Sequence, residues 1–220
     1  ERLLGKHPEV ADRHIKLWLT SEPVLRRIIH SRVFDDSELE MERVRRQVSR
    51  YVINPSLGRA RAVLEKEHVC VITGLPGIGK TTLAEILLTR YQAEGYAVIR
   101  VPNALSQVVG AARRGSKTIF YFDDFLGQTV FERWERNEDQ RLTDFMDAVR
   151  HEAGWRFILT TREYILKEAK LASEALSRLS LKERTCVITL DQDYTSSLRA
   201  RVLYQHLYFS DLPESHILAL

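Results

Sequence analysis

Hydrophobic residues follow two different patterns along the chain, and the change falls near residue 55. Before it, apolar residues recur every three or four positions, which predicts helices. We expect one helix from a first turn containing Pro8 to about Thr20 and a second capped by Ser21, with its buried stripe at Val24, Leu25, Ile28 and Ile29. In a third, Ser37 and Glu40 fit a capping box ahead of Met41, Val44, Val48, Tyr51 and Val52. Asn54-Pro55 should end that helix, so residues 1–54 are expected to be all-helical.

From Ser56 onward, short apolar runs alternate with amphipathic stretches of helix length. Each run has about five residues and no polar alternation, which is typical of strands buried on both faces of a parallel sheet. The runs are Val69–Thr73, Ala97–Val101, Thr118–Phe122, Arg156–Thr160 and Cys186–Leu190. One intervening helix is expected over Thr82–Glu94, with Gly95 as its stop. The alternation predicts a doubly wound α/β domain with right-handed crossovers.

Beyond Asp191 another helix is expected, with Leu198, Val202, Leu203 and Leu207 as its apolar positions. The predicted division is a helical segment over 1–54, an α/β core over 55–191 and the start of a helical subdomain over 192–220. Because the sequence begins with Glu1 rather than Met, we expect it to be a piece of a longer protein.

Composition narrows the class of protein without identifying it. Of 220 residues, 44% are hydrophobic and 29% charged, which predicts a soluble, globular protein. Residues 1–20 carry charges throughout and do not resemble a signal peptide, so we expect a cytoplasmic location. The apolar runs are too short to span a bilayer, so no membrane partner is expected. A net charge of +3 gives no reason by itself to expect a nucleic-acid partner.

The first chemical signal is Gly74-Leu75-Pro76-Gly77-Ile78-Gly79-Lys80-Thr81, followed by Thr82. It matches the glycine-rich phosphate loop in full, between an apolar strand and an amphipathic helix, which is the context this motif requires. Its glycines let backbone N–H groups approach phosphate oxygens at a helix N-terminus. The cofactor is expected to be ATP or ADP. Lys80 is expected to reach the β- and γ-phosphates when ATP is bound, and the Thr81 hydroxyl to ligate Mg²⁺.

A second signal is the apolar strand Ile119–Phe122, which ends in Asp123 and Asp124. Strands of one parallel sheet end at the same edge, so these carboxylates should lie beside the phosphate loop. Asp123 is then placed to hold Mg²⁺ through water, and Asp124 to polarise the attacking water. Without the phosphate loop, an ordinary strand-terminating turn would be the better interpretation.

Three further assignments each have an alternative interpretation. The strand ending in Thr160-Thr161-Arg162 would bring Arg162 to the γ-phosphate, although a surface arginine beside a helix cap is the alternative. Gln128 is a candidate for orienting water, or simply part of a turn. Tyr51 and Pro55 precede the first core helix and are candidates for packing on the adenine base, or for core packing.

Taken together, these motifs resemble the STAND class of P-loop NTPases, and more narrowly the bacterial novel STAND NTPase 3 group. The similarity covers about Tyr51 to Pro213. The runs that carry it are Val69–Thr82, Phe120–Gln128, Phe157–Tyr164 and His206–Pro213. The resemblance implies a five-stranded parallel sheet of order five-one-four-three-two. It also implies a nucleotide-dependent switch between a closed monomer and a homo-oligomer.

The same resemblance implies effector and sensor domains on the same chain and a role in anti-phage defence. The effector is often a nuclease, through which nucleic acid would be a partner. Two other classes remain open: an AAA+-like motor or DNA-remodelling ATPase with continuous turnover, and a scaffold in which ATP is only structural. The rate of turnover separates the three, because a motor cycles quickly, a switch slowly and a scaffold not at all.

Overall fold

A computed structural model describes residues 31–48, 51–102, 105, 108, 110–125, 138–173, 177, 185–188 and 193–209 of the chain. The two helices expected before residue 31, and Gln128, lie outside these residues. Within them, the elements run in the order α4 (Ser31–Val48), α5 (Pro55–Glu67), β1 (Val69–Gly74), α6 (Lys80–Ala93), β2 (Ala97–Arg100) and β3 (Thr118–Phe122). They continue as α7 (Glu138–His151), β4 (Trp155–Arg162), α8 (Glu163–Ala172), β5 (Thr185–Ile188) and α11 (Ser196–Tyr208).

The five strands form one sheet in the order β2-β3-β4-β1-β5, and every neighbouring pair is parallel. Read from the β5 edge, this order is five-one-four-three-two. The register pairs Val69 with Phe157 and Gly74 with Arg162. Because all strands run the same way, the C-terminal ends of β1, β3 and β4 lie at one edge of the sheet.

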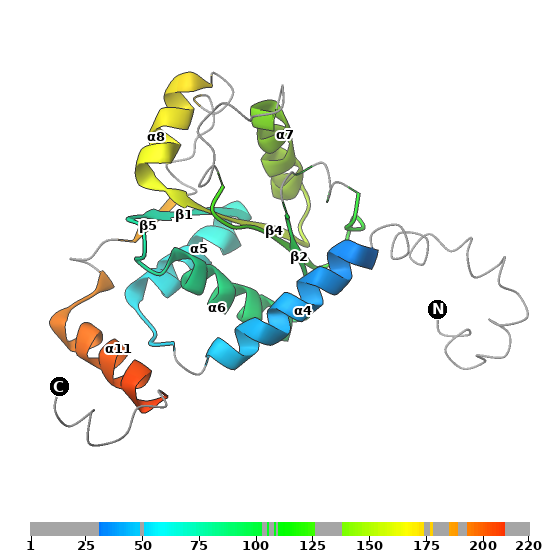
Figure 1. Ribbon diagram of the computed structural model, residues 1–220. Coiled ribbons are helices and arrows are strands. Elements are labelled where there is room, and N and C mark those ends of the chain that lie inside the picture. Colours follow the sequence, from blue (N-terminus) through cyan, green and yellow to red (C-terminus); the bar gives the residue numbers. More distant parts are fainter. Residues whose placement is uncertain are drawn as a thin grey trace, which may run out of the picture.

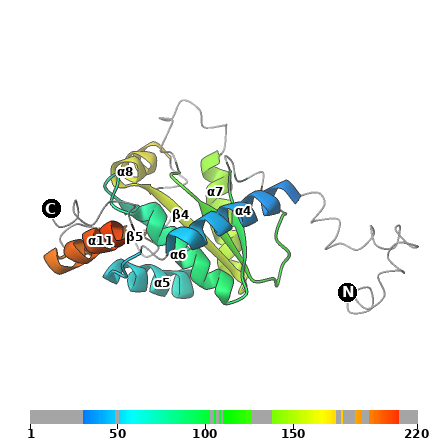
Figure 2. The same ribbon diagram turned by 60° about the horizontal axis from the view of Figure 1, so that its bottom comes forward.

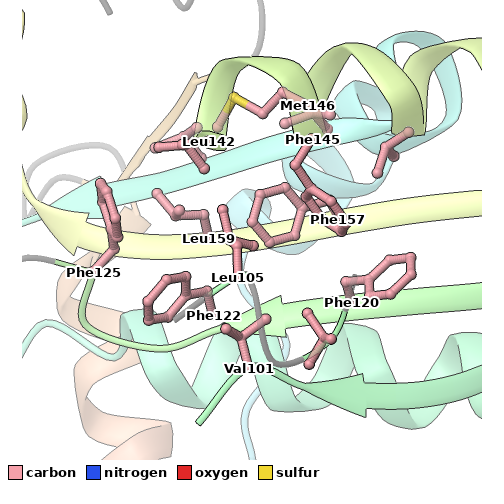
Figure 3. Packing of buried hydrophobic residues seen from close by; sticks show 14 of the residues in the cluster. Val101, Leu105, Phe120, Phe122, Phe125, Leu142, Phe145, Met146, Phe157 and Leu159 are labelled. Carbon is pink, nitrogen blue, oxygen red and sulfur yellow. The ribbon is translucent and has the colours of Figure 1, made fainter. Parts of the chain in front are cut away.

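Helices cover both faces of the sheet. In Figures 1 and 2, α7 and α8 lie on one face, and α4, α5 and α6 lie on the other. Alternate residues of each strand pack against the helices on opposite faces of the sheet, so both faces are buried and the strands lack polar alternation. On the α7 side, strand residues such as Phe120, Phe157 and Leu159 pack with Leu142, Phe145 and Met146, as Figure 3 shows. On the other side, Ile72, Ile119 and Ile158 pack with residues of α4, α5 and α6.

Helix α4 differs from its prediction at the N-terminal end. It already includes Ser31, so Ser37 lies inside the helix and the expected capping box is wrong. The Ser37 hydroxyl instead donates to the Val33 carbonyl at 2.6 Å and accepts from the backbone N–H of Arg100 at 3.0 Å. A serine hydroxyl that bonds back to the preceding turn is compatible with a helix interior, and here it also ties α4 to β2.

Two other helices begin close to their expected positions. Pro55 occupies the first turn of α5, where its missing N–H costs nothing. Helix α6 begins at Lys80, two residues before the expected start. Within the described ranges, no helix is both long enough and apolar enough to cross a membrane.

Candidate functional site

The loop between β1 and α6 has the backbone that its glycines permit. Gly77 and Gly79 have φ angles of 75° and 93°, in the left-handed region that other residues rarely adopt. No atom lies within 4 Å of a Cβ built on Gly77, so the backbone angle alone calls for glycine there. Gly79 is the residue before α6, and the loop therefore leads directly into a helix N-terminus, where N–H groups and the helix dipole favour an anion.

Lys80 folds back over this loop. Its Nζ donates to the carbonyl of Leu75 at 2.9 Å and to that of Gly74 at 3.3 Å. Partial burial lowers the pKa of Lys80, and the nearby charges of Asp124 and Asp123 oppose that change. The predicted phosphate-binding lysine and both predicted carboxylates thus lie close together.

Asp123 sits at the centre of a short hydrogen-bonded chain. Its Oδ1 accepts from the Thr81 hydroxyl at 3.1 Å and from the Thr160 hydroxyl at 2.6 Å. Thr81 belongs to α6 and Thr160 to β4, so the Asp123 carboxylate links the end of β3 to both of these elements. The Thr81 hydroxyl and the Asp123 carboxylate, 3.1 Å apart, both offer hard oxygen ligands. Such a pair suits a Mg²⁺ ion that keeps most of its water ligands.

Asp124 is held in an unusual conformation. Its φ of 44° is left-handed, which is uncommon for a residue other than glycine. The Thr160 hydroxyl accepts its N–H at 2.7 Å, and the Thr160 carbonyl accepts the N–H of Phe125 at 2.8 Å. The Thr161 hydroxyl donates to the Phe125 carbonyl at 2.8 Å. Both threonines therefore use their hydroxyls to fix the turn.

Arg162 ends β4 at the same edge. Its Nε lies 4.0 Å from Asp124 Oδ1, and its NH1 donates to the Tyr164 hydroxyl at 3.1 Å. The side chain is about one-third exposed, which leaves it free to reorient toward an anion. The structure thus brings together Lys80, Thr81, Asp123, Asp124 and Arg162, as the sequence predicted from their strand and loop ends.

Beside the phosphate loop lies a cavity of about 480 Å³. Of the two residues predicted to pack on the adenine base, Tyr51 lines this cavity, whereas Pro55 is exposed and is not among the lining residues. One wall comes from the segment before α5 and the phosphate loop, and the opposite wall from α11 and the residues before it. The lining residues are Tyr51, Val52, Asn54, Gly77, Ile78, Gly79, Thr82, Tyr194, Val202 and His206.

Tyr194 is the residue of this cavity that sequence reasoning missed most completely. Its hydroxyl donates to the carbonyl of Ile78, inside the phosphate loop, at 2.8 Å. Burial raises the pKa of Tyr194, as does the charge of Asp193, so the hydroxyl stays protonated and can donate. Asp193 is itself fully buried and pairs with Arg59 of α5 at 2.8 Å.

No spacing pattern in the sequence indicates a role for Tyr194, because it lies 112 residues after Thr82 and is not part of a recognised motif. His206, which resembles an isolated structural histidine in the sequence, also lines the cavity. A possible signal was the apolar helix after residue 191, whose inner face had to pack against some part of the core. Its contact with the loop follows only from the three-dimensional arrangement.

Three comparisons with known proteins bear on this site. The family model described as Novel STAND NTPase 3 matches residues 51–209, most of the chain. No curated protein matches. Among solved structures, the crystal structure of the DnaC helicase loader is similar at 20% identity and a TM-score of 0.39, covering 63% of this chain and 93% of that one.

Proposed function

The chain belongs to the Novel STAND NTPase 3 family and is therefore a nucleotide-binding NTPase module; we propose that it binds ATP with Mg²⁺ and hydrolyses it slowly, as a switch. One observation carries the nucleotide-binding part of this proposal. A complete phosphate loop, with left-handed Gly77 and Gly79, leads into α6 beside a Thr81–Asp123 contact of 3.1 Å.

The phosphate groups are assigned to the loop and Lys80. Backbone N–H groups from Gly77 to Thr82 would bind them, with Pro76 and Ile78 shaping the loop. Lys80 bonds to the carbonyls of Gly74 and Leu75 in the same loop. Phosphate oxygens would replace those carbonyls as acceptors, and a charged acceptor makes the stronger hydrogen bond.

Mg²⁺ is assigned to Thr81 and Asp123. Its role would be to neutralise phosphate charge, while the Thr160 hydroxyl keeps the Asp123 carboxylate oriented. Asp124 is assigned to the attacking water, as the residue that accepts its proton. Arg162, now near Asp124, would turn to the γ-phosphate and stabilise its charge.

The adenine base is assigned to the cavity of about 480 Å³, with Tyr51 as one wall. A volume of that size falls within the usual range for small-molecule sites. Burial raises the pKa of Tyr51 to about 12, so its ring presents a neutral face at physiological pH. Because Pro55 faces solvent, we assign the opposite wall to residues of α11 instead.

The switch role rests on family membership and on the resemblance to STAND signalling ATPases. We propose that nucleotide state controls assembly into a homo-oligomer in the full-length protein. An effector, such as a nuclease, and a sensor on the same chain would act in anti-phage defence in the cytoplasm. The described residues support the nucleotide site only, and the partners follow from the resemblance.

Calorimetry with Mg²⁺–ATP tests the nucleotide assignment. Lys80→Ala should weaken ATP binding about tenfold to a hundredfold, because a hydrogen bond to a charged group is worth about 1.5–3 kcal/mol. Lys167→Ala is a matched control, since Lys167 is exposed on α8 and, among the described residues, pairs only with Glu163 at 3.1 Å. Unchanged ATP affinity in a folded Lys80→Ala variant would overturn the proposal.

A further inference from the structure

The contact between Tyr194 and the phosphate loop has a specific geometric consequence. Tyr194 precedes α11, yet its hydroxyl bonds to the Ile78 carbonyl at 2.8 Å. In a trans peptide unit, the C=O and the N–H point in opposite directions within one plane. Fixing the Ile78 carbonyl therefore fixes the direction of the Gly79 N–H, which belongs to the same peptide unit.

The left-handed φ of 93° is the reason that Gly79 is glycine. A Cβ built on Gly79 would lie 2.9 Å from the Tyr194 hydroxyl, so that side chain would have to shift to make room for it. The short distance shows that the tyrosine lies directly against the loop.

The segment that carries Tyr194 is anchored from its other side as well. Asp193 is fully buried, and Arg59 of α5 binds both of its carboxylate oxygens, at 2.8 and 3.0 Å. Leu198, in the first turn of α11, is also buried. The tyrosine is thus held on a fixed base rather than on a loose tail, which a positioning role requires.

From this geometry we propose that Tyr194 is a positioning residue for phosphate binding, which acts through the Ile78 carbonyl and couples α11 to the occupied loop. It orients the Gly79 N–H toward the bound phosphate without touching the phosphate itself. A carbonyl that accepts a hydrogen bond also makes the N–H of the same peptide unit a better donor.

The coupling works in both directions. If the docked Tyr194 strengthens phosphate binding, bound phosphate must strengthen the docking of Tyr194 and α11 by the same factor. The helix would therefore respond to the phosphate end of the nucleotide as well as to any contact with the base. This inference rests on the proposed nucleotide site.

The first test measures affinity for inorganic pyrophosphate and for adenosine in the 220-residue protein. Tyr194→Phe removes only the hydroxyl, so it should weaken pyrophosphate binding about twofold to tenfold, the value of one neutral hydrogen bond. Adenosine binding should not change. Tyr204→Phe is the matched control, because Tyr204 is an exposed tyrosine on α11 that does not line the cavity of about 480 Å³.

The second test follows α11 itself, by limited trypsin digestion at Arg199 and Arg201. Pyrophosphate should slow cleavage in the wild type and in Tyr204→Phe, and should have no effect in Tyr194→Phe. A residue that merely stabilised the fold would alter cleavage equally with and without pyrophosphate.

The outcomes separate this inference from the proposed function. If the wild type fails to bind Mg²⁺–ATP, the proposed function and this inference both fail. If it binds in a Lys80-dependent way but Tyr194→Phe binds pyrophosphate like the wild type, only the positioning role is overturned. A loss of adenosine binding with pyrophosphate unchanged would also overturn it, and would make Tyr194 a base contact.

Discussion

Replacing Thr160 by valine tests how the carboxylate turn is built. Thr160 is almost completely buried, and its hydroxyl has two partners: it donates to Asp123 Oδ1 at 2.6 Å and accepts the N–H of Asp124 at 2.7 Å. Valine has nearly the same shape, so the substitution removes both bonds and leaves no large cavity. The Asp123 carboxylate and the Asp124 N–H would each lose a partner.

The magnitude follows from the kind of bond. A hydrogen bond to a charged group contributes about 1.5–3 kcal/mol, and an unsatisfied N–H adds to the cost. Because the two bonds share one hydroxyl, their contributions are not simply additive, and we expect about 2–4 kcal/mol of lost unfolding free energy. Loss of a partner that orients a metal ligand typically weakens metal binding about tenfold to a hundredfold. We expect that loss in the Mg²⁺-dependent part of ATP affinity.

Urea unfolding measures the first effect, and calorimetry with ATP in the presence and absence of Mg²⁺ measures the second. Thr143→Val is the matched control, since Thr143 is also buried, and within the described part of the chain its hydroxyl bonds only to the Gln140 carbonyl of α7, at 2.7 Å. It should cost about 1 kcal/mol and leave the effect of Mg²⁺ unchanged. Equal behaviour of the two variants would refute the role given to Thr160.

Substitutions at the other site residues should each affect a different step: Mg²⁺ binding, hydrolysis or recognition of the γ-phosphate. Asp123→Ala should abolish the effect of Mg²⁺ on ATP affinity in calorimetry. Asp124→Asn should bind Mg²⁺–ATP normally but lose phosphate release, because asparagine tolerates the left-handed backbone and cannot accept the proton of water. Phosphate release at the wild-type rate by Asp124→Asn would show that Asp124 is not the base. Arg162→Ala should bind ADP normally and ATP more weakly, because the guanidinium is expected to reach only the γ-phosphate; equal losses for both nucleotides would place it elsewhere.

The strands and the phosphate edge could be predicted because they depend on short-range patterns. Continuous apolar runs marked β1 and β3, and the polar residues after each run marked the edge where Lys80, Asp123 and Arg162 meet. Strand ends depend also on pairing with a neighbouring strand: β4 continues to Arg162 because its last residues pair with β1 up to Gly74. Apolarity alone suggested that the strand stopped at Thr160.

Contacts between distant segments could not be predicted in the same way. Ser37 fitted a capping box because the local pattern suits one. Its hydroxyl instead accepts the N–H of Arg100 in β2, 63 residues further along the chain. Tyr194 and His206 reach the cavity only because α11 returns to the phosphate loop. Local sequence carries no information about either contact, since each depends on how whole elements pack.

Slow turnover is the prediction that distinguishes a switch from a motor. Fast hydrolysis commonly needs an arginine finger on the γ-phosphate, worth about 10³–10⁵ in rate. Arg162 is assigned to the γ-phosphate of the same chain, but it must first leave Asp124 and Tyr164, so it is not already positioned for fast hydrolysis. Arg113 and Arg114 precede β3, at the edge of the sheet opposite the phosphate loop, so they could serve only a neighbouring subunit.

We therefore expect the chain to bind ATP but to turn it over at less than about one per second, below the median for enzymes. A steady-state phosphate-release assay, with the mass in solution measured in the same sample, checks this. Lys80→Ala supplies the background rate. A monomer that releases phosphate tens of times per second would exclude the switch, because such a rate would require a complete catalytic site within one chain, as an AAA+-like motor or DNA-remodelling ATPase with continuous turnover would need. A slow monomer that accelerates as its mass increases would instead indicate that a second copy supplies the missing cation.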